Sequence, residues 1–323
     1  MTIFQDIDSI SADQLRRIGA TKWQKGHDLI GAFIAEMDFG IAPAITEALH
    51  QEVDIGRFGY FPDRLAGDLA DATAGWLESR FDWANSPSDI RRVSDVIRAY
   101  EFAIVHGCRA GAAVIVPTPA YKPFLLLPPM MNRRVIEVPM TMADAKYVFD
   151  MEALQAAFDA GGELLVLCNP YNPGGRVFGR EELVALSELV ARNDGRLFAD
   201  EIWSPLTFPG HSHIPYASVS RAAAGHSITA ISASKAWNMP GLKCAQVIIT
   251  NDRDRESWAT VGPLFEHGAS NLGAVATVAA YQAGDGWLAD INAYLDRNRM
   301  ALANLIGEHL PEVGYHAPEG TYI

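Results

Sequence analysis

Lys235 lies in the stretch SASKAWNMPGLK, residues 232–243, directly after an apolar run that ends at Ile231. A lysine amine is a weak nucleophile while protonated, but burial or a neighbouring cation lowers its pKa and lets it form a Schiff base with an aldehyde. Lys243 is a candidate second cation that could also bind phosphate, and Ser232 adds a hydroxyl donor. Alone, Lys235 would be a surface lysine after a strand, but with these neighbours it favours a phosphorylated aldehyde cofactor.

Two further polar residues also follow apolar runs. Asp200 ends the stretch RLFAD at 196–200, where a buried acid is costly without a partner. It could be a helix cap or half of a salt bridge, or it could keep the pyridine nitrogen of pyridoxal phosphate (PLP) protonated, which makes the ring a better electron sink. Asn172 lies in NPYNPGGR, whose prolines and glycines build a turn. Its amide could serve that turn alone, or it could donate to the ring oxygen of the cofactor.

An aromatic residue and a predicted helix start complete the set of candidates. Tyr121 stands in PTPAYKPF, where it could be a packing residue or could stack on a flat ring. A helix is predicted to begin at Ser94 in SDVIRAYEFAI, and the backbone N–H groups of Asp95 and Val96 could bind phosphate there. The carboxylate of Asp95 would repel that phosphate, so its side chain would have to turn away.

The scaffold that positions these residues is predicted from hydrophobic periodicity. Helical patterns cover 41–55, 63–79, 94–106, 151–160, 180–193 and 286–309. Short apolar runs predict strands at 114–117, 134–139, 163–169, 196–201, 227–232 and 244–250. This alternation predicts an α/β fold with a largely parallel sheet covered on both faces. Ligands of such sheets bind beyond the carboxyl ends of the strands, which is where several candidates are expected.

Length and composition limit the other possibilities. In this chain of 323 residues we expect a large domain at 46–285, with 1–45 packing against a smaller domain that begins at 286–323. No apolar run reaches the roughly 18 residues of a membrane span, and the stretch MTIFQDIDSISADQLRRIG does not show the basic-then-apolar pattern of a secretion signal. The net charge of −13 argues against nucleic acid and anionic membranes. The three widely spaced cysteines predict free thiols in a cytoplasmic protein. We expect no metal site, because the histidine pair at 211–213 lacks further ligands.

Three motifs carry a resemblance to a known family. NPYNPGGR, ADEIW and SASKAWNMPGLK resemble, in this order, the signatures of the PLP-dependent aminotransferase class I/II superfamily, fold type I. A sharper resemblance joins AEMDFGIAPAITEAL, FGYFP and VPTPAYKPFL to its MalY/PatB-type carbon–sulfur lyases, the cystathionine β-lyase branch. The resemblance implies a three-layer α/β/α large domain with a mostly parallel sheet and a smaller α+β domain. In that family the chain normally continues beyond PEGTYI and supplies an arginine for the substrate carboxylate, so we expect this small domain to be incomplete.

The resemblance also implies the roles of the central residues. Lys235 would form the Schiff base with PLP and later move the Cα proton of the substrate. Asp200 would pair with the pyridine nitrogen, and Asn172 would donate to the ring oxygen. Tyr121 would stack on the ring. Trp203 stands where aminotransferases often carry a tyrosine, and its indole N–H could donate to the ring oxygen.

Around this centre, the resemblance implies that Ser232 and Lys243 hold the phosphate. Tyr60, in FGYFP, would reach the cofactor of a neighbouring subunit, which makes the active unit a homodimer. The implied reaction is β-elimination from cystathionine or another S-substituted cysteine, which yields a thiol, pyruvate and ammonia. An aminotransferase is the alternative, because fold and cofactor do not determine the reaction. A third possibility is a PLP-binding regulatory protein that acts through a partner.

Overall fold

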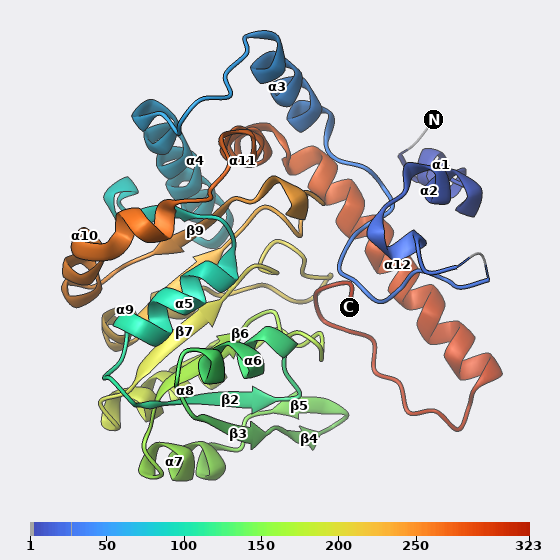
Figure 1. Ribbon diagram of the computed structural model, residues 1–323. Coiled ribbons are helices and arrows are strands. Elements are labelled where there is room, and N and C mark those ends of the chain that lie inside the picture. The colour runs from blue at the N-terminus through green and yellow to red at the C-terminus, as the bar shows by residue number, and fades with distance from the viewer. Residues whose placement is uncertain (1–2, 27) are drawn as a thin grey trace.

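The computed structural model describes residues 3–26 and 28–323, and its centre is a seven-stranded sheet (Figure 1). From one edge to the other, the strands are β1 (Ile90–Val93), β9 (Ala245–Ile248), β8 (Ser227–Ile231), β7 (Arg196–Asp200), β6 (Gly162–Cys168), β2 (Ala113–Thr118) and β3 (Val135–Pro139). All neighbouring pairs from β8 to β3 are parallel, and β9 runs antiparallel to both β8 and β1. The prediction of an α/β fold with a mostly parallel sheet is confirmed.

Five of the six strands that were predicted as apolar runs are largely buried, and the sixth, the edge strand β3, is mostly accessible. Strands β7 and β8 are buried at every residue, and β6 at every residue after Gly162. Such continuous apolar segments are typical of parallel strands that are covered on both faces. Strand β1, with the sequence IRRV, was not predicted because two arginines interrupt its apolar pattern. The small hairpin of β4 (Thr141–Ala143) and β5 (Lys146–Val148) was not predicted either.

Six helices agree with the predicted periodic segments within a few residues. They are α3 (Pro43–Asp54), α4 (Asp63–Phe81), α5 (Val96–His106), α7 (Met151–Asp159), α8 (Arg180–Arg192) and α12 (Asp285–His309). Six others were not predicted: α1 (Ile3–Asp8), α2 (Ala12–Ile18), α6 (Lys122–Met130), α9 (Arg221–His226), α10 (Asp252–Glu266) and α11 (Asn271–Ala283). Prolines inside α6 and α10 obscure their helical pattern, and α1, α2 and α9 are too short to show one.

The two ends of the chain lie side by side. Helices α1 and α2 lie next to the long helix α12, at the side of the molecule away from α10 (Figure 1). Asp8 accepts a hydrogen bond from the Tyr294 hydroxyl at 2.8 Å and forms an ion pair with Arg297 at 2.6 Å. None of the helices in the described residues is long and apolar enough to cross a membrane.

Sheet register brings the loops beyond three central strands together. Cys168 pairs with Asp200 across β6 and β7, and Asp200 pairs with Ala230 across β7 and β8. Because these strands are parallel, their carboxyl ends lie at the same edge of the sheet. The segments that begin at Asn169, Glu201 and Ser232 therefore leave the sheet next to one another.

Candidate active site

A cavity of about 320 Å³ lies at this edge of the sheet. It is lined by side chains from the ends of β6, β7 and β8, from the start of α5 and α6, and from two distant segments. The lining residues are Ala32, Phe33, Ile34, Ala35, Val96, Tyr121, Cys168, Asn172, Asp200, Ile202, Trp203, Lys235, Tyr322 and Ile323. Six of the ten residues predicted for the site thus line one cavity, although their distances in the sequence are large.

Asp200 is the buried acid of the cavity. Its side chain is almost inaccessible, and Oδ1 accepts a hydrogen bond from the backbone N–H of Ile202 at 3.0 Å. Burial raises the pKa of Asp200 to about 7, although the Ile202 amide and the charge of Lys235 oppose this shift. Among the described residues, no side chain donates to this carboxylate. A ligand that brings a protonated nitrogen would supply the missing donor.

Lys235 is the half-buried amine of the same cavity. Its Nζ donates to the Ala35 carbonyl at 3.4 Å and lies 5.8 Å from the centre of the Trp203 ring. Burial lowers the pKa of Lys235, and the charges of Asp200 and Glu36 oppose that shift. A larger fraction of this amine is therefore neutral at a given pH than for an exposed lysine, which is the form that reacts with an aldehyde.

Aromatic side chains form part of the cavity wall. Trp203 is almost fully buried and its ring meets Tyr322 edge-on at 4.9 Å between centroids. Tyr121 is 40% exposed, and its ring packs edge-on against Phe124 at 5.5 Å. Burial raises the pKa of Tyr121, so the phenol is neutral at ordinary pH. The predicted stacking role of Tyr121 is compatible with this open, aromatic position.

The residues predicted to hold phosphate, Ser232 and Lys243, are bonded to protein groups instead. Ser232 is buried, donates to the Cys244 carbonyl at 2.7 Å, accepts from the Ser234 N–H at 3.1 Å, and is not part of the cavity wall. Lys243 Nζ lies 3.0 Å from Oδ2 of Asp95. The Asp95 carboxylate therefore has not turned away from the helix start, as phosphate binding would require.

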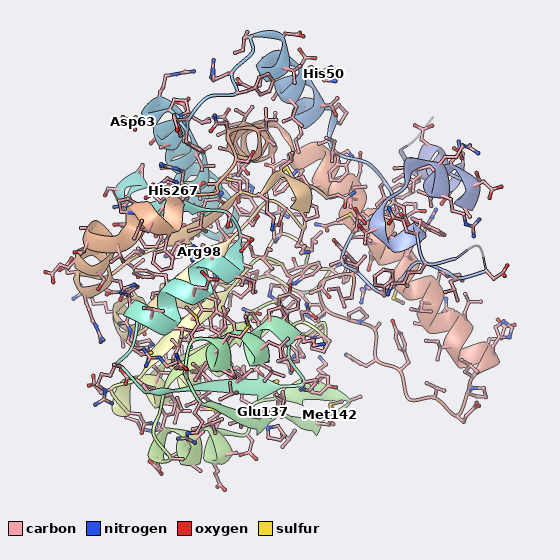
Figure 2. All side chains as sticks on the ribbon, viewed as in Figure 1. His50, Asp63, Arg98, Glu137, Met142 and His267 are labelled. Atoms are coloured by element: carbon pink, nitrogen blue, oxygen red, sulfur yellow. The ribbon has the colours of Figure 1, made fainter. Side chains whose placement is uncertain are left out.

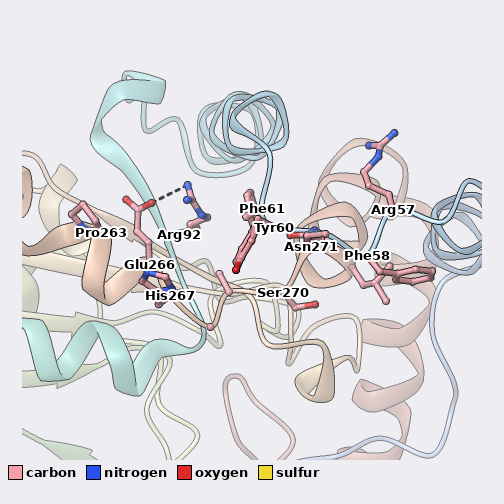
Figure 3. A pocket seen from close by; sticks show the side chains of 14 residues that line it. Arg57, Phe58, Tyr60, Phe61, Arg92, Pro263, Glu266, His267, Ser270 and Asn271 are labelled. Atoms are coloured by element: carbon pink, nitrogen blue, oxygen red, sulfur yellow. Dashed lines mark hydrogen bonds and ion pairs between the residues drawn. The ribbon is translucent and has the colours of Figure 1, made fainter.

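Tyr60 lies outside the cavity and is fully exposed. It lines a separate open pocket of about 570 Å³, in which Arg92 and Glu266 form an ion pair at 2.9 Å (Figure 3). Ser270 and Asn271 line the other part of this pocket. In its own chain, Tyr60 is therefore not placed to contact a ligand bound at Lys235.

Sequence reasoning missed several lining residues. Cys168 and Ile202 flank predicted residues at strand ends, so their neighbourhood was a usable signal. The apolar segment 32–35 and Tyr322 gave no such signal, because they reach the cavity from far along the chain. The hydroxyl of Tyr322 is buried and has no hydrogen-bond partner among the described residues.

These features fit PLP as the ligand of the cavity. A nearly inaccessible carboxylate without a side-chain donor suits a protonated pyridine nitrogen, and a half-buried lysine suits an aldehyde carbon. Tyr121, which has an aromatic ring, and Asn172, which has an amide, line the same space. Lys243 and the N-terminus of α5 lie beside this space and suit a phosphate.

Comparisons with known proteins agree with this geometry. The model of the family described as aminotransferase class I and II matches residues 33–323. The cystathionine β-lyase of Corynebacterium glutamicum is 35% identical to this chain over 314 residues, which cover 96% of this chain and 82% of that protein.

Two solved structures extend the agreement to the fold. A Corynebacterium diphtheriae protein, assigned as a PLP-dependent β-cystathionase, matches with a TM-score of 0.91 and 38% identity over 97% of this chain and 81% of its own. The PLP-bound C–S lyase of Staphylococcus hominis matches with a TM-score of 0.86 and 29% identity over 95% of this chain and 79% of its own. The chain therefore belongs to the PLP-dependent aminotransferase class I and II family, in the branch of the cystathionine β-lyases.

Proposed function

We propose that this protein is a PLP-dependent carbon–sulfur β-lyase that converts cystathionine or a related S-substituted cysteine to a thiol, pyruvate and ammonia. The observation that carries the proposal is the placement of Lys235 and Asp200 in one cavity, where burial shifts the pKa of each toward its neutral form. The similarity to cystathionine β-lyases and C–S lyases selects this reaction within the family.

Bound PLP supplies a conjugated ring that takes up the electron pair left at Cα of an amino acid. Asp200 would hold a proton on the ring nitrogen, because its carboxylate is buried and otherwise lacks a side-chain donor among the described residues. Lys235 Nζ would accept the Cα proton, since a lowered pKa provides the neutral amine needed for a base. Loss of the β-thiolate from the substrate then completes the elimination.

The other cavity residues would orient the substrate and exclude water. Trp203 and Ile202 give the cavity an apolar wall next to Lys235, where fewer waters compete for the reacting atoms. Tyr121 and Asn172 lie on the same cavity and are proposed to contact the ring face and the ring oxygen. Ser232 keeps its proposed phosphate role only if its hydroxyl leaves the Cys244 carbonyl.

A homodimer is part of this proposal. Tyr60 is fully exposed and Phe58 is 62% exposed, and both line the open pocket beside Ser270 and Asn271. Exposed aromatic side chains gathered at one concave surface are typical of interaction sites. A second copy of the chain would cover them and would bring Tyr60 to the cofactor of its partner.

The domain division at 1–45, 46–285 and 286–323 is also a proposal. The contacts of Asp8 with Tyr294 and Arg297 support the packing of the N-terminal segment against the smaller domain. A cytoplasmic location is proposed because the three cysteines are free and buried, as in proteins of reducing compartments.

The experiment that tests the function uses purified protein supplied with PLP. We expect a visible absorption band from lysine-bound cofactor and, after addition of L-cystathionine, equal amounts of pyruvate and thiol. Lys235→Ala should lose both, whereas Lys122→Ala, which changes an exposed lysine at the start of α6, should keep both.

Other outcomes separate the alternatives. A band without pyruvate, followed by amino transfer to an added keto acid, would favour an aminotransferase. A band with neither reaction would favour a regulatory role. Absence of any band from the wild-type protein would contradict the PLP proposal itself.

A further inference from the structure

An ion pair closes the N-terminus of α5 beside the cavity. Asp95 is the N-cap residue of this helix, and its Oδ1 accepts the backbone N–H of Arg98 at 3.0 Å. Its other oxygen, Oδ2, lies 3.0 Å from Nζ of Lys243. Val96, the next residue, lines the cavity that contains Lys235. The Asp95 carboxylate thus binds both the N-terminus of α5 and the ammonium group of Lys243.

Neighbouring groups show that the charge of Asp95 acts toward the cavity. The pKa of Tyr121, which lines the cavity, is raised mainly by burial and to a smaller extent by the charges of Asp200 and Asp95. The one arginine in the first turn of α5 is Arg98, which is labelled on this helix in Figure 2. Its guanidinium is turned elsewhere and meets Glu101 and the Leu264 carbonyl. Arg98 therefore does not offset the negative charge that Asp95 places at this edge.

We propose that Asp95 is an internal competitor of the cofactor phosphate, so that PLP binds by exchanging the Asp95 carboxylate for a phosphate oxygen at Lys243. This inference rests on the proposed PLP function and adds a residue that sets the affinity. A carboxylate and a phosphate cannot both receive the full attraction of one ammonium and one helix N-terminus. Wild-type Asp95 should accordingly weaken PLP binding, and removal of its charge should strengthen it.

The exposure of the pair allows such an exchange. The side chain of Lys243 is 58% exposed and that of Asp95 is 39% exposed, so water can replace either partner during the exchange. Exposed ion pairs contribute little net stability, and breaking this one should hardly affect folding. The hydrogen bond to the Arg98 N–H is independent of the charge and can persist with an uncharged oxygen acceptor.

The matched variant is Asp95→Asn, because asparagine caps a helix as well as aspartate does and removes only the charge. We expect the dissociation constant of PLP, measured by absorbance or fluorescence titration at low salt, to fall about tenfold. Pyridoxal, which has the aldehyde but no phosphate, should bind Asp95→Asn and wild type equally. The gain for PLP should shrink as salt is added, because salt screens exposed charges.

A second background tests the exchange itself. In Lys243→Gln, PLP binding should weaken, and adding Asp95→Asn should recover much less than the tenfold gain. An equal gain with and without Lys243 would overturn the exchange, since simple repulsion needs no lysine. Weaker PLP binding by Asp95→Asn, or an equal change for PLP and pyridoxal, would also overturn it. Both results leave the lysine-bound band of the wild type intact, so they are distinct from failure of the proposed function.

Discussion

Two consecutive buried carboxylates, one at the end of strand β7 and one directly after it, meet different surroundings. Asp200 faces the cavity and accepts one backbone hydrogen bond, from Ile202. Glu201 is enclosed by protein: Oε1 accepts the Tyr216 N–H at 2.7 Å, and Oε2 lies 3.1 Å from Nε2 of His213. In sequence the two are simply neighbouring acids, but only Glu201 has a side-chain partner among the described residues.

The difference in hydrogen-bond partners indicates that Asp200 binds a ligand, whereas Glu201 supports the fold. Buried polar groups are normally hydrogen-bonded, so an acid that lacks side-chain partners indicates that something else binds it. Burial raises the pKa of Asp200 to about 7, which means that the charged form is unfavourable until a cation arrives. Glu201, in contrast, is paired with a protein side chain, that of His213. His213 is the buried histidine of the segment 211–213. The segment 211–213 therefore supports the fold through this contact.

The largest effect is expected from Asp200→Asn. Activity should fall about 100- to 1,000-fold, because the variant no longer holds charge against the cofactor ring. The free energy of unfolding of the cofactor-free variant should, in contrast, be higher than that of the wild type. The folded carboxyl keeps its proton up to about pH 7, whereas the unfolded one releases it near its usual pKa of 3.8. The folded state thus binds more protons between these values, and stability falls as pH rises through them.

Urea unfolding of the cofactor-free proteins at pH 5 and pH 8 checks this sign. Asp200→Asn should be more stable than wild type at pH 8, by up to about 4 kcal/mol, and the difference should shrink at pH 5. Equal stability of both proteins at pH 8 would show that Asp200 is not held at a cost. The contrast with Glu201 would then lose its basis.

Glu201→Gln should lower stability and leave activity almost unchanged. Glutamine keeps an oxygen for the Tyr216 N–H but replaces the charged partner of His213, so unfolding free energy should fall by about 1–3 kcal/mol. Activity per folded molecule should stay within a few-fold of wild type. A loss as large as that of Asp200→Asn would mean that Glu201 belongs to the site.

The centre of the site was predictable because local signals and topology coincide there. Asn172, Asp200 and Lys235 each follow an apolar run, and parallel strands bring their carboxyl ends to one edge. The helices with clear periodicity were predicted for the same reason, since each has a simple amphipathic pattern. Here the sequence pattern and the tertiary arrangement depend on the same apolar segments.

The surroundings of the centre were not predictable, because they depend on contacts between distant segments. No local pattern tells that Glu201 meets His213, that Tyr322 reaches Trp203, or that Asp95 meets Lys243. For Asp95 the sequence did reveal a conflict with phosphate, and it made phosphate binding at this helix start conditional on the side chain turning away. The structure shows the carboxylate at the helix N-terminus instead, because the cap and Lys243 both attract it.

A third prediction concerns Tyr60, which is fully exposed, whereas Asp200 is buried. If Tyr60 reaches the phosphate of a neighbouring subunit, Tyr60→Ala should weaken PLP binding about 10- to 100-fold, the effect of losing one hydrogen bond to a charged group. At a PLP concentration too low to saturate Tyr60→Ala, mixing this variant with inactive Lys235→Ala should restore activity, because the mixed dimer contains one complete site. No recovery after proven subunit exchange would show that Tyr60 acts within its own chain or not at all.

The smallest effect is expected from Tyr322→Phe, which tests whether a buried group without a partner indicates a ligand contact at this site too. The Tyr322 hydroxyl is buried beside Trp203 and has no partner among the described residues. If the substrate supplies that partner, KM should rise about three- to tenfold with kcat nearly unchanged, while unfolding free energy of the cofactor-free protein stays equal or rises by about 1 kcal/mol. Tyr315→Phe, which changes a more exposed tyrosine of the same segment, is the control and should change neither. An unchanged KM together with lower stability would place Tyr322 with Glu201, as a residue that supports the fold, and would limit the ligand-binding region to the ends of the strands.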